Sequence, residues 1–385
     1  MDEGRLIREL FVTGRLYPWV IGGTGQVQYH LTRSLSSSGK CGVTLLGTYP
    51  LGEKFPFHLY SGIDVRPIPT PGGRNSLGDL LASNVAFPFS MMETEYDIVH
   101  LNVLPGLRVL TLTQFVKRRN AKLIVNVHGV PDEVNMIVGD PLFRFFAKIH
   151  WSVSVGKFSW VDAFVVNSNW VKQHMNGLLP AERVFVIPNG VPSNLFTYAL
   201  PTRDDGKTIL CFGDIVPVKG KDLLIRAFAS SRLSRSHTLL FIGNSNFGTK
   251  ERLCELAKNL GVESNTRFLP AMSRNELVDV IRDSVVCVTP SRLEPFGIPV
   301  LEAMALGKTV IATRFGGPAD FVSDGVDGFL IDPRDTEAFA DLLGRVCCDE
   351  SLRHTVGALA RRKAERYAWE RIAQLYLDLY RRLLK

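Results

Sequence analysis

The chain has 385 residues, of which 45% are apolar and 22% are charged, and its formal net charge is +7. The length suggests two domains, and the composition is that of an ordinary globular protein. No apolar run reaches ~18 residues, which excludes a membrane-spanning helix, and the basic balance favours an anionic partner or a merely soluble basic enzyme.

The cysteines point to a reducing compartment. They form no Cys-x-x-Cys pair and no metal-site spacing, and two of them, Cys211 and Cys287, sit in apolar runs where cysteine behaves as a small hydrophobe. The N-terminal stretch lacks the pattern of a signal peptide. We therefore expect a cytoplasmic protein without structural disulfides.

The first half of the chain predicts a parallel sheet with helices on both faces, because apolar runs alternate with helical or irregular connections. The runs are 7–12, 43–46, 63–68, 98–101, 123–127, 161–166 and 184–187. Between the first two runs, residues 14–25 form a loop that contains Gly22 and Gly23. This loop can cradle a phosphate or be a flexible surface loop. It is not a dinucleotide fingerprint, because Gln28 stands at the third glycine position.

His128 directly follows the apolar run 123–127. Ligands of open parallel sheets bind beyond the carboxyl ends of the strands, so His128 is a candidate ligand contact. The alternative is a histidine that makes a local structural hydrogen bond.

Residues 143–160 are rich in aromatic side chains interleaved with Arg144, Lys148 and Lys157, and residues 117–122 are basic. An amphipathic helix of this kind can lie on a membrane surface. A core helix with a solvated face explains the same pattern, and both interpretations stay open.

The second half repeats the alternation of strands and helices from Thr208 to Ile331 and ends in an amphipathic helix over 369–384. The aperiodic stretch 195–205 predicts the linker between the halves. We expect five residues to share the apolar face of the last helix: Ile372, Leu375, Tyr376, Leu379 and Leu383.

Residues 285–305 predict a strand, a loop and a helix that opens near Gly297, with Pro299 in its first turn. The amides of Phe296, Gly297 and Ile298 are then free to bind phosphate at the helix N-terminus. Glu302 follows Ile298 by four residues, about 6 Å along the axis, which suits a ribose next to a diphosphate.

Glu294 precedes the same helix and can hold a group attached to the far phosphate. Two carboxylates that flank an anion-binding helix start indicate a nucleotide sugar. The alternative is a pair of solvated charges. Lys219 near the start of another helix can add a point charge to the phosphate.

The sequence from Glu294 to Glu302, with Pro-Phe-Gly-Ile-Pro-Val-Leu between them and Ala-Met-Ala-Leu-Gly-Lys-Thr-Val-Ile-Ala-Thr after them, resembles the donor-site motif of retaining GT-B glycosyltransferases. These form a large family, glycosyltransferase family four of the group 1 type, which includes bacterial mannosyltransferases and sucrose synthases. The resemblance implies an α/β fold of two doubly wound Rossmann-like domains that face each other across a cleft. We expect the domains at 1–198 and 199–364, with the helix in 365–385 crossing back onto the first.

The resemblance also implies roles for individual residues. Gly22 and Gly23 match the family's Gly-Gly loop under the donor phosphates, and His128 matches the histidine that touches the transferred sugar and phosphate. Lys219 matches the lysine of a Gly-Arg-x-x-x-x-Lys-Gly loop that holds the diphosphate.

Two further positions of the second half are compared with the family. Asp214 stands where the family has the arginine of that loop. The negative charge of an aspartate is the wrong charge for a phosphate contact. Leu269 matches the place where the base lies against the backbone, although a buried strand end explains it equally well.

The implied function is transfer of a hexose from a nucleotide diphosphate sugar, of the GDP-mannose or UDP-glucose type, to a hydroxyl of a glycan, lipid or small molecule. The resemblance implies retention of configuration and no cofactor. We expect no metal either, because the sequence has no Asp-x-Asp motif in a fitting loop. We expect no nucleic-acid partner, and residues 117–122 and 143–160 are the candidate contact with the inner membrane face. A nucleotide-sugar 2-epimerase and a non-catalytic sugar-nucleotide binder remain as alternatives.

Overall fold

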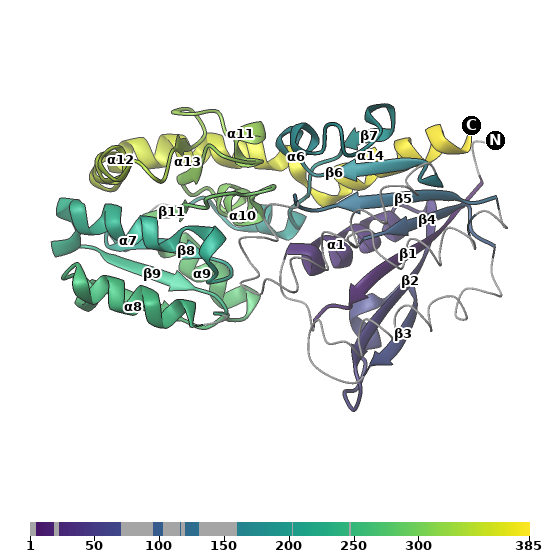
Figure 1. Ribbon diagram of the computed structural model, residues 1–385, viewed down its shortest axis with the longest axis horizontal. Helices are drawn as coiled ribbons and strands as arrows, with labels where there is room; N and C mark the ends of the chain where they lie inside the picture. Colours follow the sequence, from purple (N-terminus) through teal and green to yellow (C-terminus); the bar gives the residue numbers. More distant parts are fainter. Residues whose placement is uncertain are drawn as a thin grey trace. The chain divides into compact units, whose positions relative to one another are not determined.

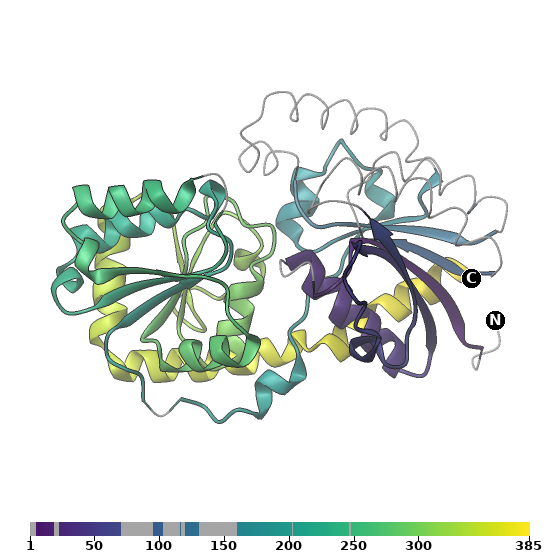
Figure 2. The ribbon, with the colours of Figure 1, turned by 90° about the horizontal axis from the view of Figure 1, so that it is seen from below.

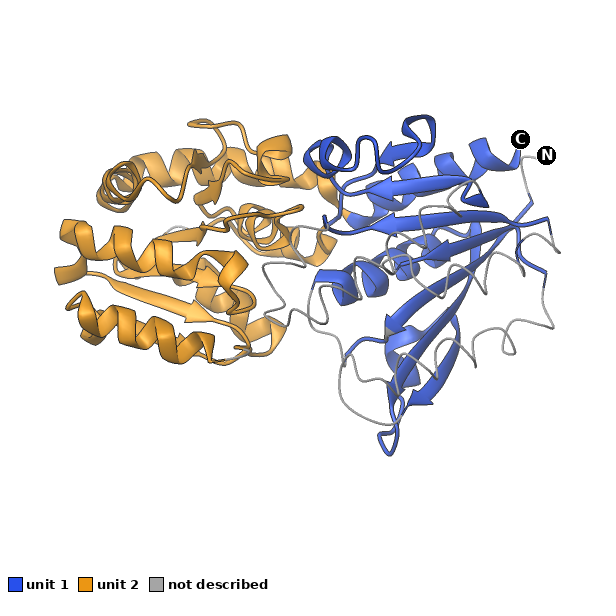
Figure 3. Ribbon diagram, in the orientation of Figure 1, with its two compact units in different colours: residues 1–130, 140–190, 369–385 blue, residues 131–139, 191–368 orange. Residues whose placement is uncertain are grey.

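The computed structural model describes residues 5–18, 23–70, 95–102, 116, 120–130, 160–201, 203–245 and 248–385. Gly22, residues 117–119 and residues 143–159 lie outside this part of the chain, and with them most of the candidate membrane contact. The chain divides into two compact units (Figure 3). The first unit comprises 1–130, 140–190 and 369–385, and the second comprises 131–139 and 191–368.

The first unit contains a parallel sheet in the order β3-β2-β1-β4-β5-β6-β7 (Figure 1). Its strands are β1 (Ile7–Arg15), β2 (Cys41–Pro50), β3 (Asp64–Thr70), β4 (Ile98–Leu101), β5 (Lys122–Val127), β6 (Ala163–Val166) and β7 (Val184–Val186). The strand order reverses between β1 and β4, and such a reversal opens a crevice at the carboxyl ends of the strands.

The connection after β1 is shorter than the sequence predicts. β1 continues to Arg15, which pairs with Thr48 of β2 after a shift of register that begins at Val12. Helix α1 (Gly23–Ser37) then begins at Gly23 and buries Val27, Leu31 and Leu35. The predicted loop over 14–25 is therefore wrong at both ends, because the bulge lets the strand pass Gly14 and the helix starts before its first large apolar residue.

The last helix of the chain, α14 (Trp369–Leu384), belongs to the first unit. The Trp369 ring lies against Gly190, where an added Cβ would come within 2.6 Å of it, and stacks 6.1 Å from the His30 ring of α1. The predicted apolar face is wrong at Leu375, which is 45% exposed. Ile372, Tyr376 and Leu379 of the predicted face are buried as expected, and the structure adds Trp369, Ala373, Leu377 and Tyr380.

The second unit contains a six-stranded parallel sheet in the order β10-β9-β8-β11-β12-β13. The strands are β8 (Thr208–Phe212), β9 (Thr238–Ile242), β10 (Thr266–Leu269), β11 (Val286–Thr289), β12 (Val310–Thr313) and β13 (Phe329–Ile331). The helices of the second unit are α7 (Lys221–Ser230), α8 (Thr249–Asn259), α9 (Arg274–Asp283), α10 (Ile298–Ala305), α11 (Pro318–Phe321), α12 (Thr336–Cys348) and α13 (Glu350–Ala364).

Helices cover both faces of the second sheet (Figure 2). Ile209 and Cys211 of β8 pack with α7, α8 and α12, whereas Leu210 and Phe212 pack with α9, α10 and α13. Side chains of a strand alternate between the two faces of its sheet, so β8 contributes side chains to two separate hydrophobic cores. The predicted pair of doubly wound α/β units is confirmed by the two sheets.

The remaining elements are short. The first unit also has α6 (Asn169–His174). Turns of 3₁₀ helix occur at Phe57–Tyr60, Ala181–Arg183, Ser193–Thr197, Pro217–Lys219, Arg232–Arg235, Glu263–Asn265 and Glu365–Tyr367.

No described helix has the length and the apolar composition that a bilayer crossing requires. All six cysteines lie within the described residues, and none of them forms a disulfide.

The close packing of the Trp369 side chain predicts that its truncation strongly destabilises the protein. Trp369→Ala should lower the free energy of unfolding of the first unit by about 3–5 kcal/mol, because a fully packed aromatic side chain leaves a cavity. Leu375→Ala on the same helix should change it by only about 1 kcal/mol or less, since Leu375 is 45% exposed. Urea unfolding of the two variants is the measurement, and equal losses would contradict this account of α14.

Candidate functional site

Three loops meet at the carboxyl edge of the second sheet, and glycine lets their backbones touch. Gly220 has φ +61°, and a Cβ there would overlap the carbonyl oxygen of Pro290. Gly316 has φ +146°, and a Cβ there would overlap the carbonyl oxygen of Glu294. A side chain fits at neither position, so both require glycine. The loops after β8, β11 and β12 are thereby locked around Glu294.

Glu294 is 5% exposed and accepts two hydrogen bonds on one carboxylate oxygen. Lys219 Nζ and Ser291 Oγ each donate to Glu294 Oε2, both at 2.9 Å. The backbone of Glu294 is fixed as well, since its carbonyl oxygen accepts from the Gly317 amide at 2.8 Å. Two predicted residues, Lys219 and Glu294, are thus in direct contact. Glu294 Oε1 accepts from no described residue and remains open to a ligand.

Helix α10 begins beside this cluster in the way the sequence predicts. Gly297 at its start has φ +97° and Pro299 lies in the first turn, while no side chain caps the amides. Phe296 contributes only its backbone, because its ring is buried against the Phe321 ring at 5.3 Å. The amides of Phe296, Gly297 and Ile298 donate to no acceptor within the described residues, which leaves an anion-binding helix start.

Glu302 lies one turn further along α10 and is also largely buried. Arg274, the first residue of α9, donates from Nη1 to Glu302 Oε1 at 2.6 Å. The second oxygen of Glu302 accepts from no described residue. A carboxylate held through one oxygen by a guanidinium keeps the other available for a hydroxyl donor.

Two other predicted positions lie apart from these contacts. Leu269 ends β10 with its side chain 41% exposed, and its carbonyl oxygen accepts from the Gly243 amide. The Asp214 side chain is exposed and makes no hydrogen bond or ion pair with a described residue. The positive charge beside Glu294 is therefore carried by Lys219.

His128 stands at the carboxyl end of β5 in the first unit. Its Nε2 lies 2.6 Å from Asn102 Oδ1, and its carbonyl oxygen accepts from Asn167 Nδ2 at 3.2 Å. Burial, helped by the charge of His100, lowers the pKa of His128 to about 4. The imidazole is therefore neutral at pH 7. Gly23, at the first position of α1, belongs to the same unit.

Three residues of these contacts were not predicted. Ser291 and Arg274 hold the two glutamates, and Asn102 holds His128. Asn102 carried a usable signal, because it directly follows a buried apolar strand and so lies at the same sheet edge as His128. Arg274 carried none, since its partner is 28 residues away in the sequence.

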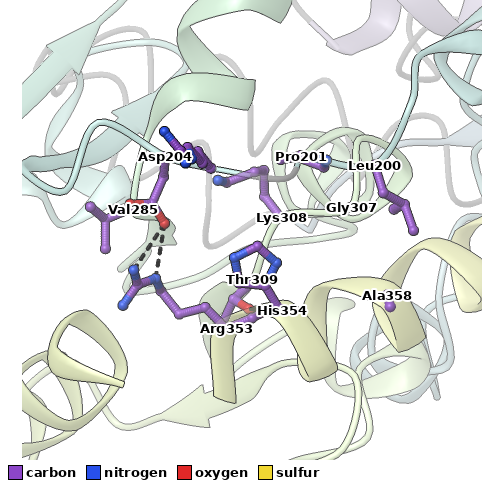
Figure 4. Close-up of a pocket in the computed structure, with 11 residues that line it drawn as sticks. Leu200, Pro201, Asp204, Val285, Gly307, Lys308, Thr309, Arg353, His354 and Ala358 are labelled. Carbon is purple, nitrogen blue, oxygen red and sulfur yellow. Dashed lines mark hydrogen bonds and ion pairs between the residues drawn. The ribbon is translucent and has the colours of Figure 1, made fainter. Parts of the chain in front are cut away.

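A cavity of about 70 Å³ lies elsewhere in the second unit (Figure 4). Its lining includes Val285 and Thr309, which precede β11 and β12, so it opens at the amino ends of the strands. Asp204 and Arg353 form an ion pair at 3.0 Å in its wall. A cavity of this size is small beside the roughly 300–1,000 Å³ of ordinary ligand pockets, and it is not the candidate donor site. No group of three metal-ligating side chains is present in the described part of the chain.

Two family models match the chain, one for each half. The model described as "Glycosyltransferase Family 4" matches residues 21–195. The model described as "Glycosyl transferases group 1" matches residues 198–363, which include Lys219, Glu294 and Glu302.

The chain is similar to proteins named D-inositol 3-phosphate glycosyltransferase. That of Actinosynnema mirum is 32% identical over 308 residues, which cover 74% of this chain and 72% of the relative. Those of Saccharomonospora viridis and Kribbella flavida are 37% and 38% identical. The chain spans about half the length of these two relatives, 44% and 52%.

Solved structures share the fold. Sucrose-phosphate synthase from Thermosynechococcus elongatus superimposes with a TM-score of 0.80 at 22% identity, over 98% of this chain and 99% of the other. Anabaena Alr3699/HepE in complex with UDP and glucose gives a TM-score of 0.76 at 21% identity, over 97% and 99%. These matches cover both units of the chain.

The contact between Gly316 and Glu294 predicts a position that tolerates no side chain. Gly316→Ala should lower the free energy of unfolding by more than about 2 kcal/mol, because the new Cβ meets backbone and the φ of +146° is strained. Gly344→Ala in α12, where nothing lies within 4 Å, should instead raise it by up to about 1 kcal/mol. Urea unfolding compares the two; a harmless Gly316→Ala would refute the packing argument.

The lowered pKa of His128 predicts a loss of stability in acid. Between the folded value of about 4 and the ordinary value of about 6.5, the unfolded chain binds more protons. The free energy of unfolding should fall by about 2 kcal/mol from pH 7 to pH 5 on account of this group. In His128→Gln that share of the loss should vanish, as measured by urea unfolding at both pH values. Equal losses in the two proteins would show that His128 is not held neutral.

Proposed function

The chain belongs to the group 1 glycosyltransferases of glycosyltransferase family 4, and we propose that it moves a hexose from a nucleotide diphosphate sugar to an acceptor hydroxyl with retained configuration. The observation that carries this proposal is the cluster of Lys219, Ser291 and Glu294 beside the open amides of α10. Glu302 one turn along the same helix adds a second carboxylate at the spacing of a ribose.

The first requirement of the reaction is departure of the diphosphate. The bond between the anomeric carbon and the phosphate oxygen breaks, and negative charge gathers on that oxygen. Lys219 and the amides at Phe296, Gly297 and Ile298 are placed to meet this charge, and fixed donors of this kind stabilise a transition state without reorganisation. The acceptor oxygen then bonds the anomeric carbon, and its proton passes to the leaving phosphate.

Glu294 is proposed to hold the sugar. Its Oε2 is occupied by Lys219 and Ser291, whereas Oε1 is open to a sugar hydroxyl. The negative charge of this carboxylate also favours the positive charge that develops at the anomeric carbon. Glu302 is proposed to accept from the ribose through the oxygen that Arg274 leaves free. His128 in the first unit is proposed to contact the transferred group.

The donor class is part of the proposal. HepE, a structural neighbour, was solved with UDP and glucose, and the relatives are named for an inositol phosphate substrate. The first name supports a nucleotide diphosphate hexose as the donor, and the second supports an acceptor hydroxyl on a small molecule. We propose a donor of the UDP-glucose or GDP-mannose type and an acceptor that is a small molecule, a glycan or a lipid. We propose a metal-independent reaction in the cytoplasm, with contact to the inner membrane face through residues 117–122 and 143–160.

Binding and turnover test the proposal together. Thermal unfolding with UDP-, GDP- and ADP-sugars should show stabilisation by one base only, and that donor should release its nucleoside diphosphate. Lys219→Ala and Glu294→Gln should each lower kcat by about 10²–10³-fold, the effect of removing one fixed charge or donor. Arg381→Ala, which breaks the exposed ion pair with Asp378 on α14, is the control and should leave kcat unchanged.

Four results would argue against the proposal. Exchange of solvent deuterium into the donor sugar without transfer indicates an epimerase, and binding without any turnover indicates a sugar-nucleotide binder. Loss of activity in EDTA would contradict metal independence. If Glu294→Gln turned over at the parent rate, the role of that carboxylate would be wrong.

A further inference from the structure

A buried chain of hydrogen bonds runs from α14 to His128 inside the first unit. The Tyr376 hydroxyl donates to Asn126 Oδ1 at 3.2 Å, and Asn126 Nδ2 donates to Asn102 Oδ1 at 3.0 Å. Asn102 Oδ1 also lies 2.6 Å from His128 Nε2. Tyr376, Asn126 and Asn102 are each at most 3% exposed, so water does not compete for these bonds.

The chain has a direction that starts at Tyr376. The Tyr376 hydroxyl donates to Asn126 Oδ1, and burial, which raises the pKa of this hydroxyl, keeps the proton on it. Asn126 receives this bond on its oxygen and so turns its amide nitrogen toward Asn102. Asn102 in turn presents its oxygen, an acceptor, to both neighbours.

The tautomer of His128 follows from that direction. Asn102 Oδ1 cannot donate, so a contact of 2.6 Å requires a proton on His128 Nε2. A neutral imidazole carries one proton, which leaves Nδ1 as an acceptor. His128 Nδ1 makes no bond to a described residue and is not among the buried unsatisfied atoms, so it is accessible.

We propose that Asn102 is a positioning residue that holds His128 as the Nε2–H tautomer, and that Tyr376 of α14 sets the orientation of Asn102 through Asn126. The inference rests on the proposed function, in which His128 contacts the transferred group. An acceptor at Nδ1 matches a sugar hydroxyl, which donates, and mismatches a phosphate oxygen, which only accepts. His128 is thereby a contact of the sugar.

A cost borne by Asn102 supports a role beyond packing. Its Nδ2 is buried without a partner, and an unsatisfied buried amide nitrogen is unfavourable. The amide therefore stands at this position in spite of one orphaned atom. What it supplies is the acceptor at Oδ1, shared by Asn126 and His128.

The same helix offers a matched control. Tyr380, one turn after Tyr376, donates to Glu9 Oε1 at 2.5 Å, and His100 Nδ1 lies 3.0 Å from the same oxygen. Both tyrosines are buried on α14, but the hydrogen bonds of Tyr380 do not lead to Asn102. Tyr380→Phe therefore removes a buried hydroxyl from the same helix and breaks none of the hydrogen bonds between Tyr376 and His128.

Nitrogen NMR of the full-length chain labelled with ¹⁵N-histidine tests the tautomer directly. His128→Gln identifies the His128 signals by their loss. We expect a neutral ring at pH 7 with the proton on Nε2 and slow exchange of that proton with water. Asn102→Leu should speed the exchange by about tenfold or more, since the bond is lost. Tyr376→Phe should also speed the exchange of the His128 proton, whereas Tyr380→Phe should leave the exchange rate unchanged.

Asn102→Asp is the conservative rescue. Its carboxylate accepts from both neighbours, so the Nε2–H tautomer should survive, and its charge should raise the pKa of His128. In transfer assays Asn102→Leu should lower kcat by about 10–100-fold with little change in the donor KM, because a misplaced group costs rate more than binding.

The outcomes separate this inference from the proposed function. An Nδ1–H tautomer in the parent chain, or unchanged exchange in both Asn102→Leu and Tyr376→Phe, overturns the positioning role. The predicted spectra in a chain that transfers no sugar would leave the tautomer standing and refute the function. The predicted spectra with an undiminished kcat in Asn102→Leu would overturn the catalytic consequence of the positioning.

Discussion

The candidate donor site depends on backbones that approach more closely than a Cβ permits. Gly220 against Pro290 and Gly316 against Glu294 bring three loops of the second sheet into direct contact. A parallel sheet delivers the ends of β8, β11 and β12 to one edge, but it does not by itself bring their loops together. The glycines do so, and as a result Lys219 reaches a carboxylate 75 residues away in the sequence.

In the first unit the corresponding constraint is the burial of polar side chains from the end of the chain. Helix α14 inserts Tyr376 and Tyr380 into the core, where each hydroxyl needs a partner. The partners are Asn126 on β5 and Glu9 on β1. These bonds tie the last helix to the sheet and also fix the register at which it packs. The polar contacts that hold α14 in place thus extend to the candidate site residue His128.

Periodic elements could be predicted from the sequence, whereas contacts between distant elements could not. The strand at 98–101 and the helix at 369–384 have the expected bounds, because one is a short apolar run and the other an amphipathic stripe with clear ends. The start of α10 was also predictable from Gly297 and Pro299. In contrast, the extension of β1 depends on pairing with β2, and the exposure of Leu375 depends on which rows of α14 meet the sheet.

The site follows the same division. Glu294, Glu302 and Lys219 stand in local motifs that can be recognised in the sequence. The roles of Arg274, Ser291 and Asn102 can be recognised only from their hydrogen-bond partners in the folded structure. Asp214 carries a signal of the opposite kind, a carboxylate where the motif has an arginine. In the structure this carboxylate is exposed and bonds to no described residue, so the described contacts of Glu294 come from Lys219 and Ser291.

The arrangement around Glu294 also bears on how a reaction at this site would proceed. A carboxylate that attacks the anomeric carbon must move within bonding distance of that carbon and give up its negative charge. Lys219 and Ser291 occupy Oε2, and the backbone of Glu294 is pinned through its carbonyl oxygen to the Gly317 amide. A side chain held at both ends is suited to orienting a hydroxyl through Oε1 rather than to moving into a covalent bond. This favours the proposed mechanism, in which the leaving phosphate and the acceptor share one face of the sugar while Glu294 stays a fixed negative charge.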